Sequence, residues 1–114
     1  MLRHRSEMKS EVLVNCHEGE GRLRAHFVMG HGDSDAGILF MHDDVLEPGA
    51  LIGEHLHEGV EELYFVAEGS GTMILDGEEY PMGPGDVSLC KSGHTHGLRN
   101  GDAPMRLIVV CVKG

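Results

Sequence analysis

Hydrophobic and polar residues alternate with a period of two in several short stretches of this chain. In RLRAHFVM, residues 22–29, apolar residues occupy every second position, and two arginines and a histidine fill most of the others. Such alternation predicts a strand with one buried face. Further strands are expected at 38–41, 62–69, 87–90 and 105–113, with a hairpin over 72–80 around Asp76-Gly77, a strong hairpin signal.

Turn residues separate these segments at short and fairly even intervals. Loops are expected at 30–37, 47–49, 81–86 and 91–97, where glycine, proline, aspartate and serine gather. No segment keeps a helical period of 3.6 residues. The pattern therefore predicts an all-β sandwich or small barrel.

The segment 62–69 is apolar on both faces of the expected strand. Leu63, Phe65 and Ala67 share one face, and Tyr64 and Val66 share the other. A strand of this kind is covered on both sides. A second sheet covers one face, and we expect a second copy of the chain to cover the other in a homodimer, although a further strand of the same chain is an alternative.

Length, charge and cysteine content narrow the classes of function. We expect one domain over residues 1–114, with a loose N-terminal segment at 1–11. A formal net charge of -10 makes nucleic acids and anionic membrane surfaces poor partners. Three cysteines without CxxC spacing, and no apolar leader, indicate a reducing cytoplasm rather than a secreted protein.

Two His-x-His pairs suggest a metal site. His55 and His57 would point to the same side of a strand, and His94 and His96 repeat the arrangement later in the chain. Glu61 or Glu62 could add a carboxylate. Nine histidines can fall close together by chance, but two such pairs at strand ends favour a site of three nitrogens and one oxygen for Fe, Mn, Ni, Zn or Cu.

Two longer motifs span residues 49–100. The first is GALIGEHLHEGVEELYFVAEG, from Gly49 to Gly69, and the second is GDVSLCKSGHTHGLRN, from Gly85 to Asn100. Their fixed glycines, histidines, glutamate and asparagine resemble the two motifs of a small single-domain cupin. One position departs from the pattern, because Lys91 stands where proline is usual.

The resemblance implies a double-stranded β-helix, or jelly roll, with one divalent transition metal. It assigns His55, His57, Glu62 and His96 as the metal ligands and places His94 at the rim. It prefers Glu62 to Glu61 because six residues separate Glu62 from the closing glycine. Glu61 remains an alternative if the loop bulges.

Such a metal keeps coordination positions open for a small polar organic substrate. The resemblance favours an enzyme of dioxygenase or isomerase/lyase type. The sequence leaves His94, Glu54 and a metal-bound hydroxide open as candidate bases. A metal-dependent protein that binds or senses a small, sugar-like molecule is the alternative, and a purely structural metal is a third. Lys91 is either a contact for an anionic substrate or a solvated loop residue.

Overall fold

The chain folds into ten β-strands and two short 3-10 helices, in a computed structural model that describes residues 1–114. The helices are η1 (Arg5–Glu7) and η2 (Cys16–Glu18). The strands are β1 (Ser10–Val14), β2 (Arg22–Met29), β3 (Ile38–Leu46), β4 (Leu51–Leu56), β5 (Val60–Glu68), β6 (Gly71–Leu75), β7 (Glu78–Met82), β8 (Val87–Cys90), β9 (Thr95–Asn100) and β10 (Met105–Lys113). The predicted all-β class is confirmed.

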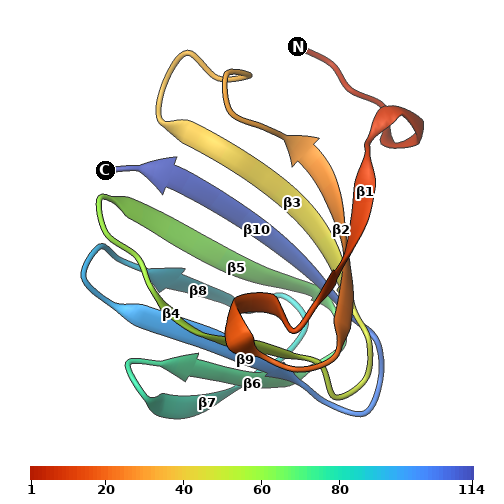
Figure 1. Cartoon of the computed structure of the whole chain (residues 1–114), viewed down its shortest axis with the longest axis vertical. Helices are drawn as coiled ribbons and strands as arrows, with labels where there is room; N and C mark the ends of the chain where they lie inside the picture. The colour runs from red at the N-terminus through yellow and green to blue at the C-terminus, as the bar shows by residue number, and fades with distance from the viewer.

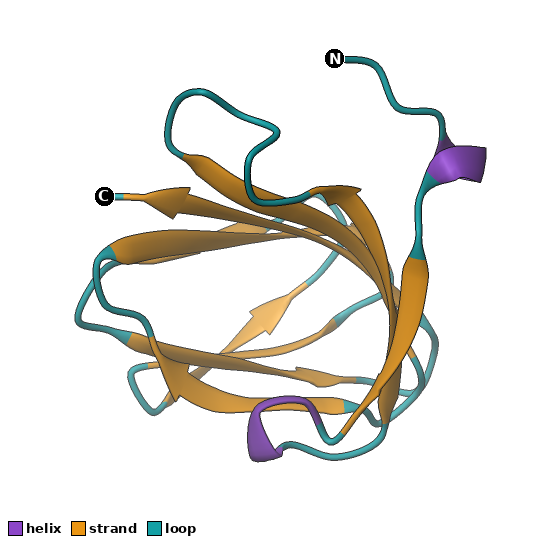
Figure 2. Ribbon diagram, turned by 45° about the horizontal axis from the view of Figure 1, so that its top comes forward, coloured by secondary structure: helices purple, strands orange, loops and turns teal.

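The strands form two antiparallel sheets that face each other (Figures 1 and 2). One sheet has the order β1-β2-β3-β10-β5-β8, and the other has the order β4-β9-β6-β7. Pairing is nested, because β3 pairs with β10, β4 with β9, β5 with β8 and β6 with β7. One long hairpin folded over on itself gives this order, which is the expected jelly roll.

Alternation along the strands decides which side chains enter the space between the sheets. In β2, Leu23 and Ala25 are buried while the arginines on either side of Leu23 are exposed. In β5, Tyr64 and Val66 point inward and are buried, whereas Phe65 points outward and is 38% exposed. The two apolar faces of β5 therefore differ: the inner face belongs to the core, and the outer face is only partly covered.

Tight turns close the hairpins where the sequence predicts them. Asp76 and Gly77 link β6 to β7 with φ values of 50° and 80°. Positive φ at both central residues is the requirement of a type I′ turn, and Asp-Gly meets it at little cost.

Three segments differ from the sequence-based expectation. The strand predicted at 38–41 continues to Leu46, because the polar residues that follow Met41 stay in register with β10. The loop predicted at 91–97 ends early, because β9 begins at Thr95 and pairs with β4. Pro81 lies in β7 rather than in a turn, and β7 is an edge strand, where proline is tolerated.

The N-terminal segment expected to be loose carries η1 and the start of β1. Arg3 donates hydrogen bonds to the Val28 carbonyl at 2.7 Å and to Asp33 at 3.0 Å. Arg5 donates to Asp43 at 3.0 Å. These contacts attach residues 3–5 to the end of β2, to the loop that follows it and to β3. Neither helix approaches the length and apolarity that a membrane-crossing helix requires.

Candidate metal centre

Four side chains from both sheets converge at one end of the space between the sheets. His55 lies on β4, and His57 follows directly after it. His96 lies on β9 opposite His55, because these two residues are register partners. Glu62 comes from β5 in the other sheet. We call these residues the four-residue cluster.

The ligand atoms of the cluster lie within 4.8 Å of one another. His96 Nε2 is 3.0 Å from His57 Nε2, 3.0 Å from His55 Nε2 and 3.1 Å from Glu62 Oε1. The same Glu62 oxygen is 3.3 Å from His57 Nε2 and 3.8 Å from His55 Nε2.

This spacing fits one shared cation. Ligands at right angles around a metal, each about 2.1 Å from it, lie roughly 3.0 Å from one another. A single ring nitrogen has one proton or one lone pair, so His96 Nε2 cannot hydrogen-bond to three close neighbours at once. A metal among the four atoms would satisfy all of them, and three imidazoles with one carboxylate suit a divalent transition ion.

Hydrogen bonds and stacking orient the imidazoles. His55 Nδ1 lies 2.8 Å from the Gly53 carbonyl, so Nδ1 carries the proton and Nε2 is left free as a ligand atom. The His96 ring stacks on Tyr64, with ring centroids 4.4 Å apart. His96 Nδ1 is buried without a hydrogen-bond partner, so packing rather than a bond sets the plane of this ring.

Glu62, not Glu61, belongs to the cluster. Glu62 is 5% exposed and points inward, whereas Glu61 lies on the opposite face of β5. Burial alone would raise the pKa of Glu62, but the surrounding imidazoles of His55, His96 and His57 outweigh it and bring the pKa to about 2. Burial lowers the pKa of His57, which keeps this imidazole neutral at pH 7. Both residues are therefore in the protonation state that binds cations.

A turn from the second motif holds His57 in place. The His57 amide donates to the His94 carbonyl at 3.1 Å, and the Gly93 amide donates to the His57 carbonyl at 2.7 Å. Gly93 has a φ of 87°, which favours glycine. Lys91 begins this turn with an exposed side chain, and the turn closes without the usual proline.

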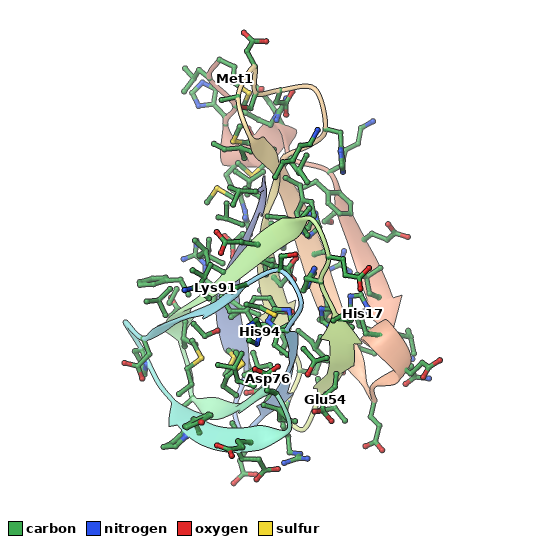
Figure 3. The ribbon with its side chains drawn as sticks, turned by 90° about the vertical axis from the view of Figure 1, so that its left-hand side faces the viewer. Met1, His17, Glu54, Asp76, Lys91 and His94 are labelled. Carbon is green, nitrogen blue, oxygen red and sulfur yellow. The ribbon has the colours of Figure 1, made fainter.

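The two candidate bases lie outside the cluster (Figure 3). His94 is half exposed, and its Nδ1 is 2.6 Å from Asp76 Oδ2. Glu54 is exposed and lies next to His55 in sequence, on the other face of β4.

His17, which was not predicted from the sequence, stacks on His55 with ring centroids 3.6 Å apart. Its segment folds back over β4 through three residues with positive φ: Asn15, His17 and Glu18. A side chain at Gly53 would collide with the His17 carbonyl, so glycine is required for this close approach. The left-handed backbone gave no periodic signal, although the Asn15 and Gly19 that bracket the segment are typical of such turns.

A cavity of about 110 Å³ lies beside the cluster, and we call it the inner cavity. Glu62 and Tyr64 line one side of it, and His17 lines another. Asp44 of β3 also lines the cavity and is 5% exposed. Its position in the acidic pair Asp43-Asp44, within an apolar segment, was the only sequence signal for it.

Comparisons with known proteins agree with this architecture. Residues 43–111 match the family described as Cupin domain. An oxalate-binding protein from Thermotoga maritima is 30% identical over 114 residues, covering 98% of this chain and 93% of that protein. A crystal structure of a predicted oxalate decarboxylase from Thermotoga maritima superposes with a TM-score of 0.94 and 26% identity, covering 100% of both chains.

A longer relative is an enzyme. A 5-nitrosalicylic acid 1,2-dioxygenase from Bradyrhizobium sp. is 30% identical over 109 residues, covering 95% of this chain but 49% of the dioxygenase. This chain therefore spans about half of that relative. The family match covers more than half of the chain, and the sheet order is the one that the two motifs imply. The chain belongs to the cupin family.

Proposed function

We propose that this protein holds one divalent transition metal at His55, His57, Glu62 and His96, and binds a small organic acid through oxygen atoms beside it. The convergence of three imidazole nitrogens and one carboxylate oxygen carries the proposal. The inner cavity supplies room for a molecule of a few heavy atoms, because its 110 Å³ is well below the roughly 300 Å³ at which drug-sized pockets begin.

A bound metal would supply Lewis-acid polarisation of a substrate oxygen, or redox chemistry toward O₂. The protein's own residues prepare the site for it. Glu62 stays ionised, and the Nδ1–H bond of His55 to Gly53 aims its Nε2 at the cluster. Tyr64 and Val109 give the cavity an apolar wall that excludes bulk water.

The enzymatic form of the proposal is a reaction of dioxygenase or isomerase/lyase type on a small polar acid. The dioxygenase relative supports this class. A proton acceptor inside the cavity would be His17 or His42, because both line it, whereas Glu54 and His94 do not. Burial lowers the pKa of both cavity histidines, so they are neutral bases at pH 7.

Binding without turnover is the second candidate function. It is favoured by the oxalate-binding relative, since that protein is matched over 93% of its length. The two forms share the metal and the ligand, and they differ only in whether the bound acid is converted.

Metal content tests the shared part of the proposal. Tag-free protein should contain near one equivalent of Fe, Mn, Ni, Zn or Cu by elemental mass spectrometry. Glu62→Ala and His57→Ala should lose it, whereas His94→Ala, at the rim, should keep it. Metal-free wild type after reloading, or loss in His94→Ala alone, would overturn the ligand set.

Turnover assays separate the two forms. Metal-loaded protein is incubated with small hydroxy and keto acids and with oxalate, while oxygen uptake and product mass are followed. Conversion that disappears in Glu62→Ala supports the enzyme. Calorimetric binding of an unchanged acid, with no conversion, supports the binding protein.

The partly exposed outer face of the six-stranded sheet supports the homodimer. Phe65 is 38% exposed, Val87 63% and Leu89 44%, and the three lie on the adjacent strands β5 and β8. Contiguous apolar surface of this kind marks interaction sites. Light scattering should give twice the monomer mass, and Phe65→Lys should give a monomer. A wild-type monomer at micromolar concentration would contradict the dimer.

We also propose that the protein lies in the cytoplasm. All three cysteines are free thiols in the structure, which suits a reducing cytoplasm.

A further inference from the structure

The inner cavity contains a carboxyl group that nothing in the protein binds. Asp44 is 5% exposed, and its Oδ1 is sealed from solvent without a hydrogen-bond partner. Its register partners are Ala25 on β2 and Leu107 on β10, and both are fully buried and apolar. Burial of an unpaired polar group costs about 1–3 kcal/mol, and more if the group is charged. A cost of this size beside the four-residue cluster indicates that a ligand completes the site.

The position of Asp44 relative to Glu62 defines two ends of the cavity. Across β10, Glu62 is level with Phe40, whereas Asp44 is level with Val66. Asp44 therefore lies two inward-facing residues deeper between the sheets. Both carboxyls line the same cavity, so one small molecule can meet the cluster at one end and Asp44 at the other.

The charges around the cavity decide which chemical group suits Asp44. The polar side chains that line it are Cys16, His17, His42, Asp44, Glu62 and Tyr64, and no lysine or arginine is among them. A second carboxylate of a ligand would therefore meet the acidic group of Asp44 and no fixed cation at this end. A hydroxyl group can donate a hydrogen bond to Asp44 without bringing negative charge.

We propose that Asp44 accepts a hydrogen bond from the hydroxyl group of a small hydroxy acid, whose carboxylate end is held at His55, His57, Glu62 and His96. This inference rests on the proposed function and narrows its ligand from small organic acids to hydroxy acids. Burial, together with the charges of Asp43 and Glu62, raises the pKa of Asp44 to about 7. A protonated carboxyl still has an acceptor oxygen, so the contact persists below neutral pH.

The test compares hydroxy acids with their deoxy partners on metal-loaded protein. Calorimetry measures 3-hydroxypropionate, 4-hydroxybutyrate and 5-hydroxypentanoate against propionate, butyrate and pentanoate. At least one hydroxy acid should bind about tenfold or more tightly than its partner, the effect of one hydrogen bond to a charged or buried group. The three chain lengths allow for the depth at which Asp44 lies.

Three variants identify the residue responsible. We call the affinity of a hydroxy acid divided by that of its deoxy partner the preference. Asp44→Leu should reduce the preference to about one while metal content is unchanged. Asp44→Asn, which keeps an acceptor oxygen, should retain most of the preference. Asp43→Asn is the matched control, because this neighbour points outward and should keep the full preference. If Asp44→Leu does not fold, loss of preference in Asp44→Ala with unchanged metal content gives the same result.

The outcomes separate this inference from the proposed function. If each hydroxy acid binds with the same affinity as its deoxy partner, the proposed role of Asp44 is wrong, while the proposed binding of an acid at the metal is unaffected. Tighter binding of oxalate or malonate at acidic pH, lost in Asp44→Leu, also overturns it, because Asp44 would then donate to a carboxylate. If no acid binds to metal-loaded protein, the proposed function fails and the inference fails with it.

Discussion

Asp43 and Asp44 are neighbours on β3 and are equally buried, yet they lie in opposite environments. Asp43, 4% exposed, faces outward and accepts hydrogen bonds from Arg106 Nε at 3.0 Å, Arg106 Nη2 at 2.8 Å and Arg5 Nη1 at 3.0 Å. Asp44, 5% exposed, faces inward, and its Oδ1 has no partner. The buried fraction therefore does not distinguish a structural carboxyl group from one that is available to a ligand. Its hydrogen-bond partners do.

The pKa values of the two groups follow the same division. Burial alone would raise the pKa of Asp43, but the hydrogen bond and charge of Arg106 outweigh it and lower the pKa. Burial raises the pKa of Asp44 to about 7, and the negative charges of Asp43 and Glu62 add to the effect. Asp43 thus stabilises the fold at neutral pH, whereas Asp44 destabilises it and remains available to a ligand.

The largest effect expected from this contrast is a pH dependence that belongs to Asp44. Its pKa is about 7 in the folded state against 3.8 for an aspartate exposed to water, so between these pH values the folded protein holds a proton that the unfolded chain has released. The contribution of this group to the free energy of unfolding is then present at low pH and is lost as the pH rises toward 7. The loss amounts to roughly 3 kcal/mol between pH 4.5 and 7.5.

Urea denaturation of metal-free protein at both pH values measures this difference. Asp44→Asn should remove that part of the pH dependence, because asparagine does not titrate. Asp43→Asn should leave most of it in place, because burial is the main cause of the raised Asp44 pKa, and the lowered pKa of Asp43 gives a contribution that is lost only as the pH falls below about 4. An identical pH dependence in wild type and Asp44→Asn would show that Asp44 ionises normally in the fold.

Much of the site could be predicted from the sequence because the strand period fixes side-chain direction. His55 and His57 are two residues apart and reach the same cluster, and Glu62 shares its inward face with Tyr64 and Val66. The fold class followed from turns such as Asp76-Gly77, whose backbone requirements are local. These features depend on neighbours in the chain.

The missed residues depend on contacts between distant segments. The sequence does not show which member of Asp43-Asp44 faces inward, because that depends on the register of β3 with β2 and β10. His17 reaches His55 only through a left-handed turn that crosses β4 at Gly53. The early start of β9 likewise follows from its pairing with β4, not from its own residues.

A second test of the contrast compares the stabilities of two variants at pH 7.5. Asp43→Ala should lower the free energy of unfolding by about 2 kcal/mol, because two arginines lose a buried partner while remaining half exposed to water. Asp44→Leu should raise it by about 1–2 kcal/mol, because an unpartnered carboxyl is replaced by an apolar group of similar shape. Urea titration of metal-loaded, ligand-free protein measures both. Changes of the same sign would mean that Asp44 has a stabilising partner after all.

The smallest effect concerns the two arginines that share Asp43. Arg106 contacts the carboxylate through two nitrogens, Nε and Nη2, whereas Arg5 contacts it through Nη1 alone and comes from the N-terminal segment. Both side chains are about half exposed, so solvent screens these pairs. Arg5→Ala should cost about 0.5 kcal/mol, and Arg106→Ala should cost more, because a two-point contact fixes the carboxylate better than a single one.

Thermal unfolding of the two single variants and of Asp43→Ala combined with each of them measures the coupling between the charges. If Arg5→Ala costs as much as Arg106→Ala, the N-terminal segment contributes to the fold through more than this one contact. If Arg5→Ala and Arg106→Ala both leave the free energy of unfolding unchanged, Asp43 stabilises the protein through its place in β3 and not through the two arginines. Asp43 and Asp44 would then differ because they lie on opposite faces of β3, and not because only Asp43 contacts arginines.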